Sequence, residues 1–210
     1  MLRILIVDDH ALVRRGVRQV ISEGLGKTII GEARSVQEAL NLVWKEKWDV
    51  VVADITLPGR SGVDLLREIK AARPKLPVLI QSMHTEEEFG VRVIKAGAAG
   101  FITKESAPEE LVKAIQQVLT GKKYVSSALA ERMAQYLEID TERPLHESLS
   151  DREYEVLRLI ASGKAPKEIA QGLSLSIKTV STYRARILEK MRLHTNAELT
   201  HYAFKHQLVG

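Results

Sequence analysis

Hydrophobic positions in the first 120 residues form short runs that alternate with longer stretches of helical periodicity. Short apolar runs bounded by turn-forming residues are typical of buried strands. The runs predict strands near residues 3–7, 28–33, 49–53, 77–82 and 99–102. The periodic stretches predict helices near residues 11–22, 36–46, 62–72, 86–95 and 108–119. Strands that alternate with helices favour repeated βα units and a doubly wound parallel sheet.

The pattern becomes fully helical from Leu149 onward. Ser150 and Glu153 have the spacing of a capping box, as do Thr195 and Glu198. The other helix boundaries are marked by Pro166, Gly172 and Ser176. Short helices joined by tight turns predict an all-α, four-helix domain of the helix-turn-helix type.

The chain therefore divides into three segments, which are residues 1–121, 122–147 and 148–210. The middle segment has a short helical pattern from Ala128 to Leu137, followed by acidic residues and Pro144. This composition is typical of an interdomain linker. We expect a flavodoxin-like α/β domain with a five-stranded parallel sheet, then the linker, then the helix-turn-helix domain.

Composition narrows the functional classes. The chain has no cysteine, which excludes disulfides and thiolate metal sites, and no segment reaches the apolar length of a membrane span. The start of the chain runs from a strand pattern directly into acidic residues, so we interpret it as a strand and expect a cytoplasmic protein without membrane contact. The net charge is only +4, but residues 178–192 carry five basic residues against the single acid Glu189. A local basic helix indicates a nucleic-acid partner.

Polar side chains stand at the carboxyl ends of four of the predicted strands. Asp8 and Asp9 follow the first strand, Asp54 the third, Ser82 the fourth and Lys104 the fifth. Reacting groups gather beyond the carboxyl ends of parallel strands, so these side chains should form one cluster. Three carboxylates repel one another unless a cation lies among them, and an all-oxygen set suits Mg²⁺ or Mn²⁺. One carboxylate can then attack phosphorus while the ammonium and the hydroxyl hold phosphoryl oxygens.

A single Asp after an apolar run is more often a turn former, so the prediction depends on the coordinated placement of all of these residues. The tight sequence from Leu57 to Gly59 also lets the Thr56 carbonyl face the metal. Residues 1–120 resemble the receiver domain of bacterial two-component response regulators. The resemblance implies that Asp54 is the phosphoacceptor and that Asp9, Asp54 and the Thr56 carbonyl bind Mg²⁺. It implies that Asp8 acts mostly through a bound water.

The same resemblance assigns a switch. Ser82 would be the hydroxyl drawn toward the phosphoryl group, Lys104 its ionic partner, and Phe101 the aromatic side chain that changes rotamer. Glu105 stands where receivers often have proline, so we do not expect a cis peptide there. His84, two residues after Ser82, is either a determinant of phosphoryl lifetime or a solvated loop histidine.

The stretch 177–191 is amphipathic when placed on a helix. Its packing face holds Val180, Ile187 and Met191. The opposite face spans about 100°, a width that fits a major groove, and it holds Lys178, Ser181, Thr182 and Ala185. That face is flanked by Arg184, Arg186 and Lys190. A solvated basic helix is the alternative.

Residues 148–209 resemble the LuxR-type helix-turn-helix, on the segments Leu149–Glu153, Lys167–Ala170, Ser176–Val180 and Glu189–Met191. Arg192 departs from this pattern, since glycine is frequent at that position. The resemblance implies that bases are faced by Ser181, Thr182 and Ala185. It implies that phosphates are held by Lys178, Thr179, Tyr183, Arg184 and Arg186.

Together the two domains resemble a response regulator of the NarL/FixJ type. We therefore expect a transcription regulator, not an enzyme, that receives a phosphoryl group from a sensor histidine kinase or a small phosphodonor. Phosphorylation would control dimerisation and binding to double-stranded DNA. The alternatives are a constitutive DNA-binding protein with a vestigial receiver, a receiver whose helical domain contacts protein, and a phosphatase. A phosphatase needs a second Asp two residues after the nucleophile, where this chain has Thr56.

Overall fold

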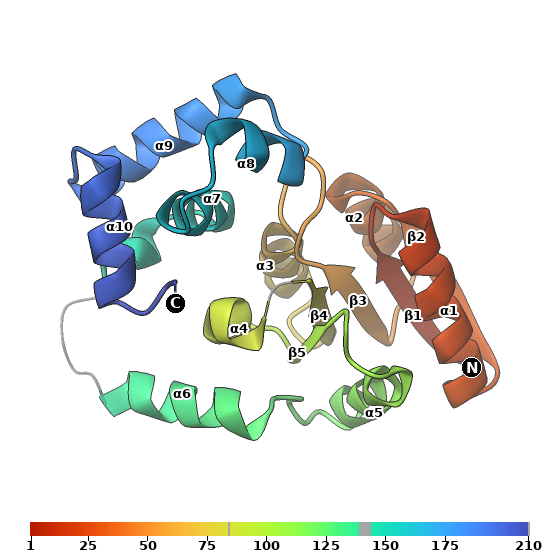
Figure 1. Cartoon of the computed structure of the whole chain (residues 1–210). Coiled ribbons are helices and arrows are strands. Elements are labelled where there is room, and N and C mark those ends of the chain that lie inside the picture. Colours follow the sequence, from red (N-terminus) through yellow and green to blue (C-terminus); the bar gives the residue numbers. More distant parts are fainter. Residues whose placement is uncertain (84, 139–143, 210) are drawn as a thin grey trace. The chain divides into compact units, whose positions relative to one another are not determined.

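The computed structural model of the chain describes residues 1–83, 85–138 and 144–209 (Figure 1). The chain separates into two compact units, residues 1–139 and 140–210. His84 lies outside the described residues, as do positions 139–143 of the predicted linker. Within the described residues, no helix combines the length and the apolar character that crossing a lipid bilayer requires.

The described part of the first unit contains a five-stranded parallel sheet in the order β2-β1-β3-β4-β5. Its strands are β1 (Leu2–Val7), β2 (Thr28–Ala33), β3 (Val50–Asp54), β4 (Val78–Ser82) and β5 (Gly100–Thr103). The chain reverses its direction of winding between β2 and β3, so that β1 and β3 lie side by side. A ligand site is expected at the carboxyl ends of these neighbouring strands. The predicted flavodoxin-like sheet is confirmed.

Helices cover both faces of this sheet (Figure 1). One face is covered by α1 (Ala11–Leu25) and α5 (Pro108–Leu119). The other face is covered by α2 (Val36–Lys45), α3 (Gly62–Ala72) and α4 (Glu86–Lys95). Because both faces are buried at the centre of the sheet, β1, β3 and β4 are mainly apolar runs. This explains why the sequence pattern located them well. The edge strand β2 is less buried and carries Glu32.

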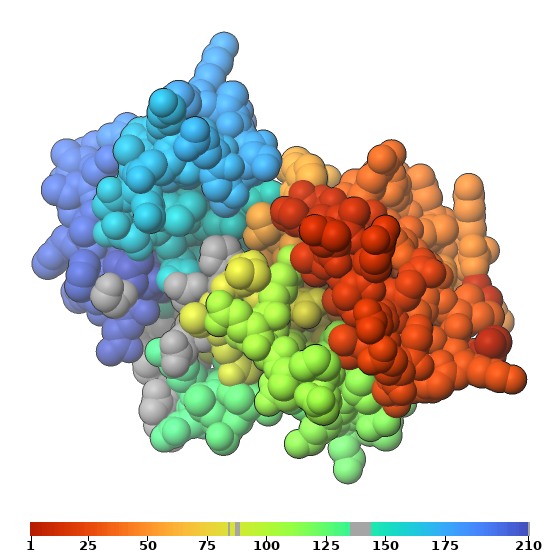
Figure 2. All heavy atoms as spheres, turned by 45° about the vertical axis from the view of Figure 1, so that its right-hand side comes forward, coloured from red at the N-terminus to blue at the C-terminus, as the bar shows by residue number. Residues whose placement is uncertain are grey.

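Successive strand residues pack on opposite faces of the sheet. Ile4 and Ile6 of β1 join a buried cluster with Val17 and Ile21 of α1 and with Ile115 of α5. Figure 2 shows α1, in red-orange, and α5, in light green, side by side on the surface above this cluster. The cluster fixes the level of β1 and therefore the position of the residues that follow it.

The segment after α5 is fastened to the first unit. The Tyr124 N–H donates to the Ala99 carbonyl at 2.8 Å, and Tyr124 forms a parallel bridge with Gly100 of β5. The helix α6 (Ser127–Glu138) then lies against α4, with Leu129 only 1% exposed. The helix predicted within the linker therefore exists and packs on the first unit, while the three domain boundaries themselves stay a prediction.

The described residues of the second unit are helical. They form the 3₁₀ helix η1 (Leu145–Ser148) and the α-helices α7 (Asp151–Ala161), α8 (Pro166–Gly172), α9 (Ile177–Met191) and α10 (Asn196–Lys205). The predicted all-α domain is confirmed, and the helix starts at Pro166 and Ser176 are found as expected.

Only one of the two predicted capping boxes is complete. The Ser150 N–H donates to Glu153 at 2.7 Å, and the Glu153 N–H donates to the Ser150 hydroxyl at 3.3 Å. At α10 the Glu198 N–H donates to the Thr195 hydroxyl at 3.2 Å, but the Glu198 carboxylate accepts the His194 N–H at 2.6 Å. The prediction of the second box was therefore wrong for one of its two bonds. The Glu198 carboxylate accepts the N–H of His194 and not that of Thr195.

Arg192 ends α9 in the left-handed conformation, with φ 54° and ψ 40°. A residue with a Cβ atom pays about 1–2 kcal/mol for this conformation, whereas glycine adopts it freely. The left-handed conformation thus explains why glycine is frequent at this position, and it makes Arg192 a strained departure from the family pattern. The left-handed backbone at Arg192 ends the helix. The last turn is closed by the Arg192 N–H, which bonds to the carbonyls of Leu188 and Glu189, and by the Leu193 N–H, which donates to the Leu188 carbonyl at 2.9 Å.

We predict that Arg192→Gly stabilises the end of α9 by about 0.5–1 kcal/mol. This value is the strain energy that glycine relieves minus the larger conformational entropy that glycine loses on folding. The measurement is amide hydrogen exchange of α9, which should slow by about two- to fivefold. Arg192→Ala is the control, because it removes the charge and keeps the strain. A similar slowing in both variants would contradict this explanation.

Candidate functional site

Acidic side chains meet at the carboxyl end of the sheet. Asp8 and Asp9 follow β1, and Asp54 is the last residue of β3. Asp8, Asp9, His10 and Asp54 each offer one ligand atom, and these atoms lie within 4.8 Å of one another. The structure therefore brings the three predicted carboxylates together, as expected from the neighbouring positions of β1 and β3.

Lys104 bridges two of these carboxylates. Its Nζ atom lies 2.7 Å from Asp8 Oδ2 and 2.6 Å from Asp54 Oδ2, and its side chain is only 9% exposed. Burial by itself lowers the pKa of Lys104, but the hydrogen bonds and charges of Asp54 and Asp8 outweigh it and hold the pKa above its usual value. The ammonium group is therefore fixed between the carboxylates as a cation.

Asp54 is buried and held from two sides. Besides the contact with Lys104, its Oδ1 atom accepts the Thr56 N–H at 3.1 Å. Burial raises the pKa of the Asp54 carboxyl, and the Lys104 ammonium opposes that shift. The Lys104 ammonium thus stabilises the charged form of the Asp54 carboxylate against the effect of burial. That the Thr56 carbonyl is a metal ligand stays a prediction.

Ser82 and Phe101 lie on adjacent strands next to this cluster. Ser82 ends β4 and is fully buried, and its carbonyl accepts the Lys104 N–H at 2.7 Å. Phe101 of β5 is 2% exposed. Among the described residues there is no cis peptide bond, in agreement with Glu105 at the position that is often proline. Ser82 therefore lies at the end of the inner strand β4 and Phe101 lies on the edge strand β5, beside the Lys104 side of the cluster. Their role as a switch stays a prediction.

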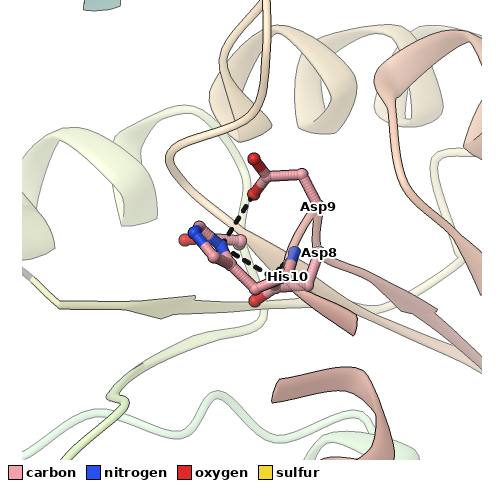
Figure 3. Close-up of side chains that lie close together, drawn as sticks. Asp8, Asp9 and His10 are labelled. Atoms are coloured by element: carbon pink, nitrogen blue, oxygen red, sulfur yellow. Dashed lines mark hydrogen bonds and ion pairs between the residues drawn. The ribbon is translucent and has the colours of Figure 1, made fainter. Parts of the chain in front are cut away.

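His10 is a residue of the cluster that sequence reasoning missed. It directly follows Asp9 and precedes α1, where its backbone N–H donates to Asp8 Oδ1 at 2.7 Å. Its ring turns back toward both carboxylates, with Nδ1 3.0 Å from Asp9 Oδ1 and 3.4 Å from Asp8 Oδ1 (Figure 3). Its position directly after Asp8 and Asp9 is the feature of the sequence that could have indicated it.

The donor set fits a divalent cation. The pocket holds three carboxylates and one buried ammonium, so negative charge remains in excess. Among the described residues, the buried Asp9 Oδ1 atom accepts no hydrogen bond. A buried carboxylate oxygen without a donor is costly unless a cation or another donor approaches it. Oxygen ligands in this number are those that Mg²⁺ and Mn²⁺ prefer.

The second unit presents α9 as an exposed surface. The predicted packing face is buried through Val180, Ile187 and Met191. Exposed positions on the helix include Lys178, Ser181, Thr182, Ala185 and Arg186, whereas Thr179, Tyr183 and Arg184 are half-buried. The residues predicted to face bases thus all reach the surface. A shallow hollow on this surface is lined by Ser176, Lys178, Thr179, Thr182, Tyr183 and Arg186.

The hydroxyl groups on this surface donate back to their own helix. Ser181 Oγ donates to the Ile177 carbonyl at 3.1 Å, and Thr182 Oγ1 donates to the Lys178 carbonyl at 3.0 Å. Each hydroxyl oxygen keeps lone pairs that point outward as acceptors. In this geometry the surface can accept a hydrogen bond from a base edge, and the Thr182 methyl group adds an apolar contact.

Two basic residues near this surface are already engaged within the unit. Arg184 Nε donates to Asn196 Oδ1 of α10 at 2.6 Å. Lys190 Nζ donates to Glu153 Oε2 of α7 at 2.6 Å. Lys190, which we expected beside the recognition face, therefore ties α9 to α7 and is less suited to holding a phosphate.

The fold and the acidic pocket define a receiver domain, joined here to a helix-turn-helix domain. The family described as "Response regulator receiver domain" matches residues 4–116. The family described as "Bacterial regulatory proteins, luxR family" matches residues 147–203. The chain belongs to the response regulators that carry a LuxR-type regulatory domain, which is the NarL/FixJ type expected from its sequence.

Individual relatives cover the whole chain. The response regulator UvrY of Escherichia coli is 38% identical over 210 residues, covering 99% of this chain and 96% of UvrY. The response regulator GacA of Pseudomonas aeruginosa is 36% identical over 211 residues, covering 100% and 98%. A solved structure of RcsB from Salmonella typhimurium matches with a TM-score of 0.61 at 27% identity, covering 97% of this chain and all of that one. RcsB has also been solved as dimers bound to DNA, with a TM-score of 0.59 at 28% identity, covering 100% of this chain and 99% of that one.

Gly62, the first residue of α3, packs directly under the acidic pocket. A Cβ atom at this position would lie 1.9 Å from the Asp54 carbonyl oxygen. We predict that Gly62→Ala destabilises the receiver domain by about 2–3 kcal/mol, because the backbone beneath Asp54 must move. The measurement is urea unfolding followed by the fluorescence of Trp44 and Trp48.

Gly16 of α1 provides the matched control. A Cβ atom there meets nothing within 4 Å, so Gly16→Ala should stabilise the domain by about 0.5–1 kcal/mol. If both variants shift the unfolding midpoint in the same direction, the packing argument for Gly62 is wrong.

Proposed function

We propose that this chain is a phosphorylation-controlled transcription regulator. Asp54 accepts a phosphoryl group from a sensor histidine kinase, and the phosphorylated chain forms a homodimer that binds double-stranded DNA through α9. The observation that carries the proposal is Lys104, held between Asp8 and Asp54 beside the Asp9 carboxylate. At this point the carboxylates offer negative charge to a cation, and the Lys104 ammonium offers positive charge to a phosphoryl group.

The chemistry is a transfer of one phosphoryl group. A carboxylate oxygen of Asp54 forms a bond to phosphorus as the bond from phosphorus to the donor breaks, and the donor leaves with that bonding pair. Asp8, Asp9, Asp54 and the Thr56 carbonyl would hold Mg²⁺, which neutralises charge on the phosphoryl oxygens when bound. Lys104 supplies a second positive charge from the opposite side.

Phosphorylation must break the present arrangement of Lys104. Its ammonium now has two carboxylate partners, and a phosphoryl group on Asp54 replaces one of them with a more strongly charged acceptor. Ser82, whose carbonyl is bonded to the Lys104 N–H, would follow toward the phosphoryl oxygens. The Phe101 N–H donates to the Tyr124 carbonyl at 3.4 Å, so movement in β5 reaches the linker directly.

DNA binding is supported by the surface of α9 and by the relatives. Small side chains at Ser181, Thr182 and Ala185 give modest direct readout of bases. Most of the affinity would therefore come from phosphate contacts by Lys178, Thr179, Tyr183, Arg184 and Arg186. A dimer covers two half-sites, which fits the dimers reported for RcsB on DNA.

Phosphatase activity is disfavoured by the residue two positions after Asp54. That residue is Thr56, whose backbone N–H only orients the Asp54 carboxylate. It has no group that acts as general acid and base near neutral pH. Two alternatives remain, a constitutive DNA-binding protein and a receiver whose helical domain contacts protein. The experiments below separate both from the proposal.

Beryllofluoride with Mg²⁺ mimics a phosphoryl group on Asp54. We expect the mimic to raise the affinity of the full chain for a selected DNA site by about tenfold or more, a coupling of about 1.4 kcal/mol between the two domains. In Asp54→Asn the mimic should change nothing, because its covalent partner is absent. The measurement is fluorescence anisotropy of labelled DNA with and without the mimic.

Asp64, which lies in α3 and completes the Ser61 capping box, gives a control for a lost carboxylate. Asp64→Asn should retain the response to beryllofluoride. Equal DNA affinity with and without the mimic in the wild type would favour the constitutive alternative.

Phosphate contacts make DNA binding depend on salt. Replacing Arg184 and Arg186 by Ala removes about four phosphate contacts from a dimer, which should lower the slope of log affinity against log salt by about 3–4. The loss should be similar for unrelated DNA sequences. Lys27→Ala with Lys113→Ala removes the same charge from exposed positions of the receiver and should leave the slope unchanged. Equal slopes in all three proteins would argue against α9 as the DNA-binding surface.

A further inference from the structure

We propose that His10 supplies a nitrogen ligand to the cation of the acidic pocket. As a consequence, the pocket would bind first-row transition-metal ions such as Mn²⁺ much more tightly than Mg²⁺. The inference rests on the proposed function, because it takes the pocket of Asp8, Asp9 and Asp54 to be a cation site.

The position of the ring carries the inference. The ligand atom of His10 lies within 4.8 Å of those of all three carboxylates. Opposite ligands of a six-coordinate ion are about 4–5 Å apart when each bond is about 2.0–2.4 Å long, so the spacing of the four groups is compatible with one shared ion. Figure 3 shows the ring turned inward over Asp8 and Asp9, although its side chain is 67% exposed and has room to point away.

The helix start gives a second, independent observation. His10 occupies the N-cap position of α1, where a Ser, Thr, Asp or Asn side chain normally accepts a helix N–H. The His10 side chain makes no such capping bond. It lies instead 3.0 Å from the Asp9 Oδ1 atom, which is buried and accepts no hydrogen bond among the described residues. The ring is thus placed at the atom that a cation would approach.

The chemistry of the ligand sets the selectivity. Mg²⁺ is a hard ion that prefers oxygen, and it gains little when an imidazole replaces a water ligand. Mn²⁺ also favours oxygen ligands but accepts an imidazole more easily than Mg²⁺ does, and affinity for nitrogen-containing sites rises further along the series of later divalent ions. An added histidine therefore favours Mn²⁺ over Mg²⁺ without changing the carboxylates that both ions share.

The experiment uses Mn²⁺ as both ligand and probe. The full chain is loaded with Mn²⁺, and electron spin-echo modulation is recorded for the wild type and for His10→Gln. We expect a nitrogen coupling in the wild type, its replacement by the ¹⁵N pattern after labelling with ¹⁵N-histidine, and its loss in His10→Gln. A nitrogen coupling that survives in His10→Gln, or its absence from the wild type with Mn²⁺ bound, would overturn the inference.

Affinities give a separate readout. His10→Gln should weaken Mn²⁺ binding by about tenfold or more and Mg²⁺ binding by less than about threefold. His194→Gln changes an exposed histidine of the other unit and should alter neither value. An equal loss for both ions would show that His10 only orients Asp9, and the ligand role would be wrong.

Asp9→Asn separates failure of this inference from failure of the proposed function. If the wild type binds both ions and Asp9→Asn binds neither, the cation site exists and the spectra decide the role of His10. If the wild type binds neither ion, the cation site is wrong and the inference falls with it.

Discussion

The balance of charge at the carboxyl end of the sheet is the constraint on which the receiver depends. Three carboxylates converge there, and one buried ammonium group, that of Lys104, compensates part of their charge. Groups of like charge in a buried site are costly without counter-ions. The Lys104 bridge therefore stabilises the pocket, and under the proposed function the bridge rearranges when a cation and a phosphoryl group enter. Under that proposal Asp8, Asp54 and the phosphoryl group compete for the Lys104 ammonium, which cannot contact all of them at once, and this competition is the basis of a switch.

The sheet makes this convergence possible. Asp8 and Asp54 belong to neighbouring strands because β3 pairs with β1, and Lys104 reaches them from the end of β5, two strands further along. Packing of β1 against α1 and α5 fixes the position of Asp8 and Asp9, which follow β1. Gly62 sets the level of Asp54, since only a residue without Cβ lets α3 begin directly under it. The chemistry of the pocket thus rests on packing some distance from it.

Much of this arrangement could be predicted from the sequence, and particular residues explain why. The strands that lead to the pocket are mainly apolar, so the polar residue at the end of each is conspicuous, and their convergence follows from parallel topology. His10 was missed because a histidine at the start of a helix has no periodic signal. The pairing of Lys190 with Glu153 joins residues 37 positions apart, a contact that helical periodicity cannot reveal. The left-handed Arg192 was recognisable only as a departure from a family pattern, since nothing in its own chemistry favours that conformation.

An open sheet has two edges, and each is a template for pairing with another chain. In this receiver the β5 edge is occupied by Tyr124, whose backbone groups bond to residues 99 and 101. At the β2 edge, Glu32 lies in a charged cluster with Arg14 and Arg18 of α1. Charged side chains along an edge strand discourage intermolecular pairing. The sheet is therefore protected against growth into continuous β-structure, and receivers of this chain can associate through helix surfaces while their strands remain intramolecular.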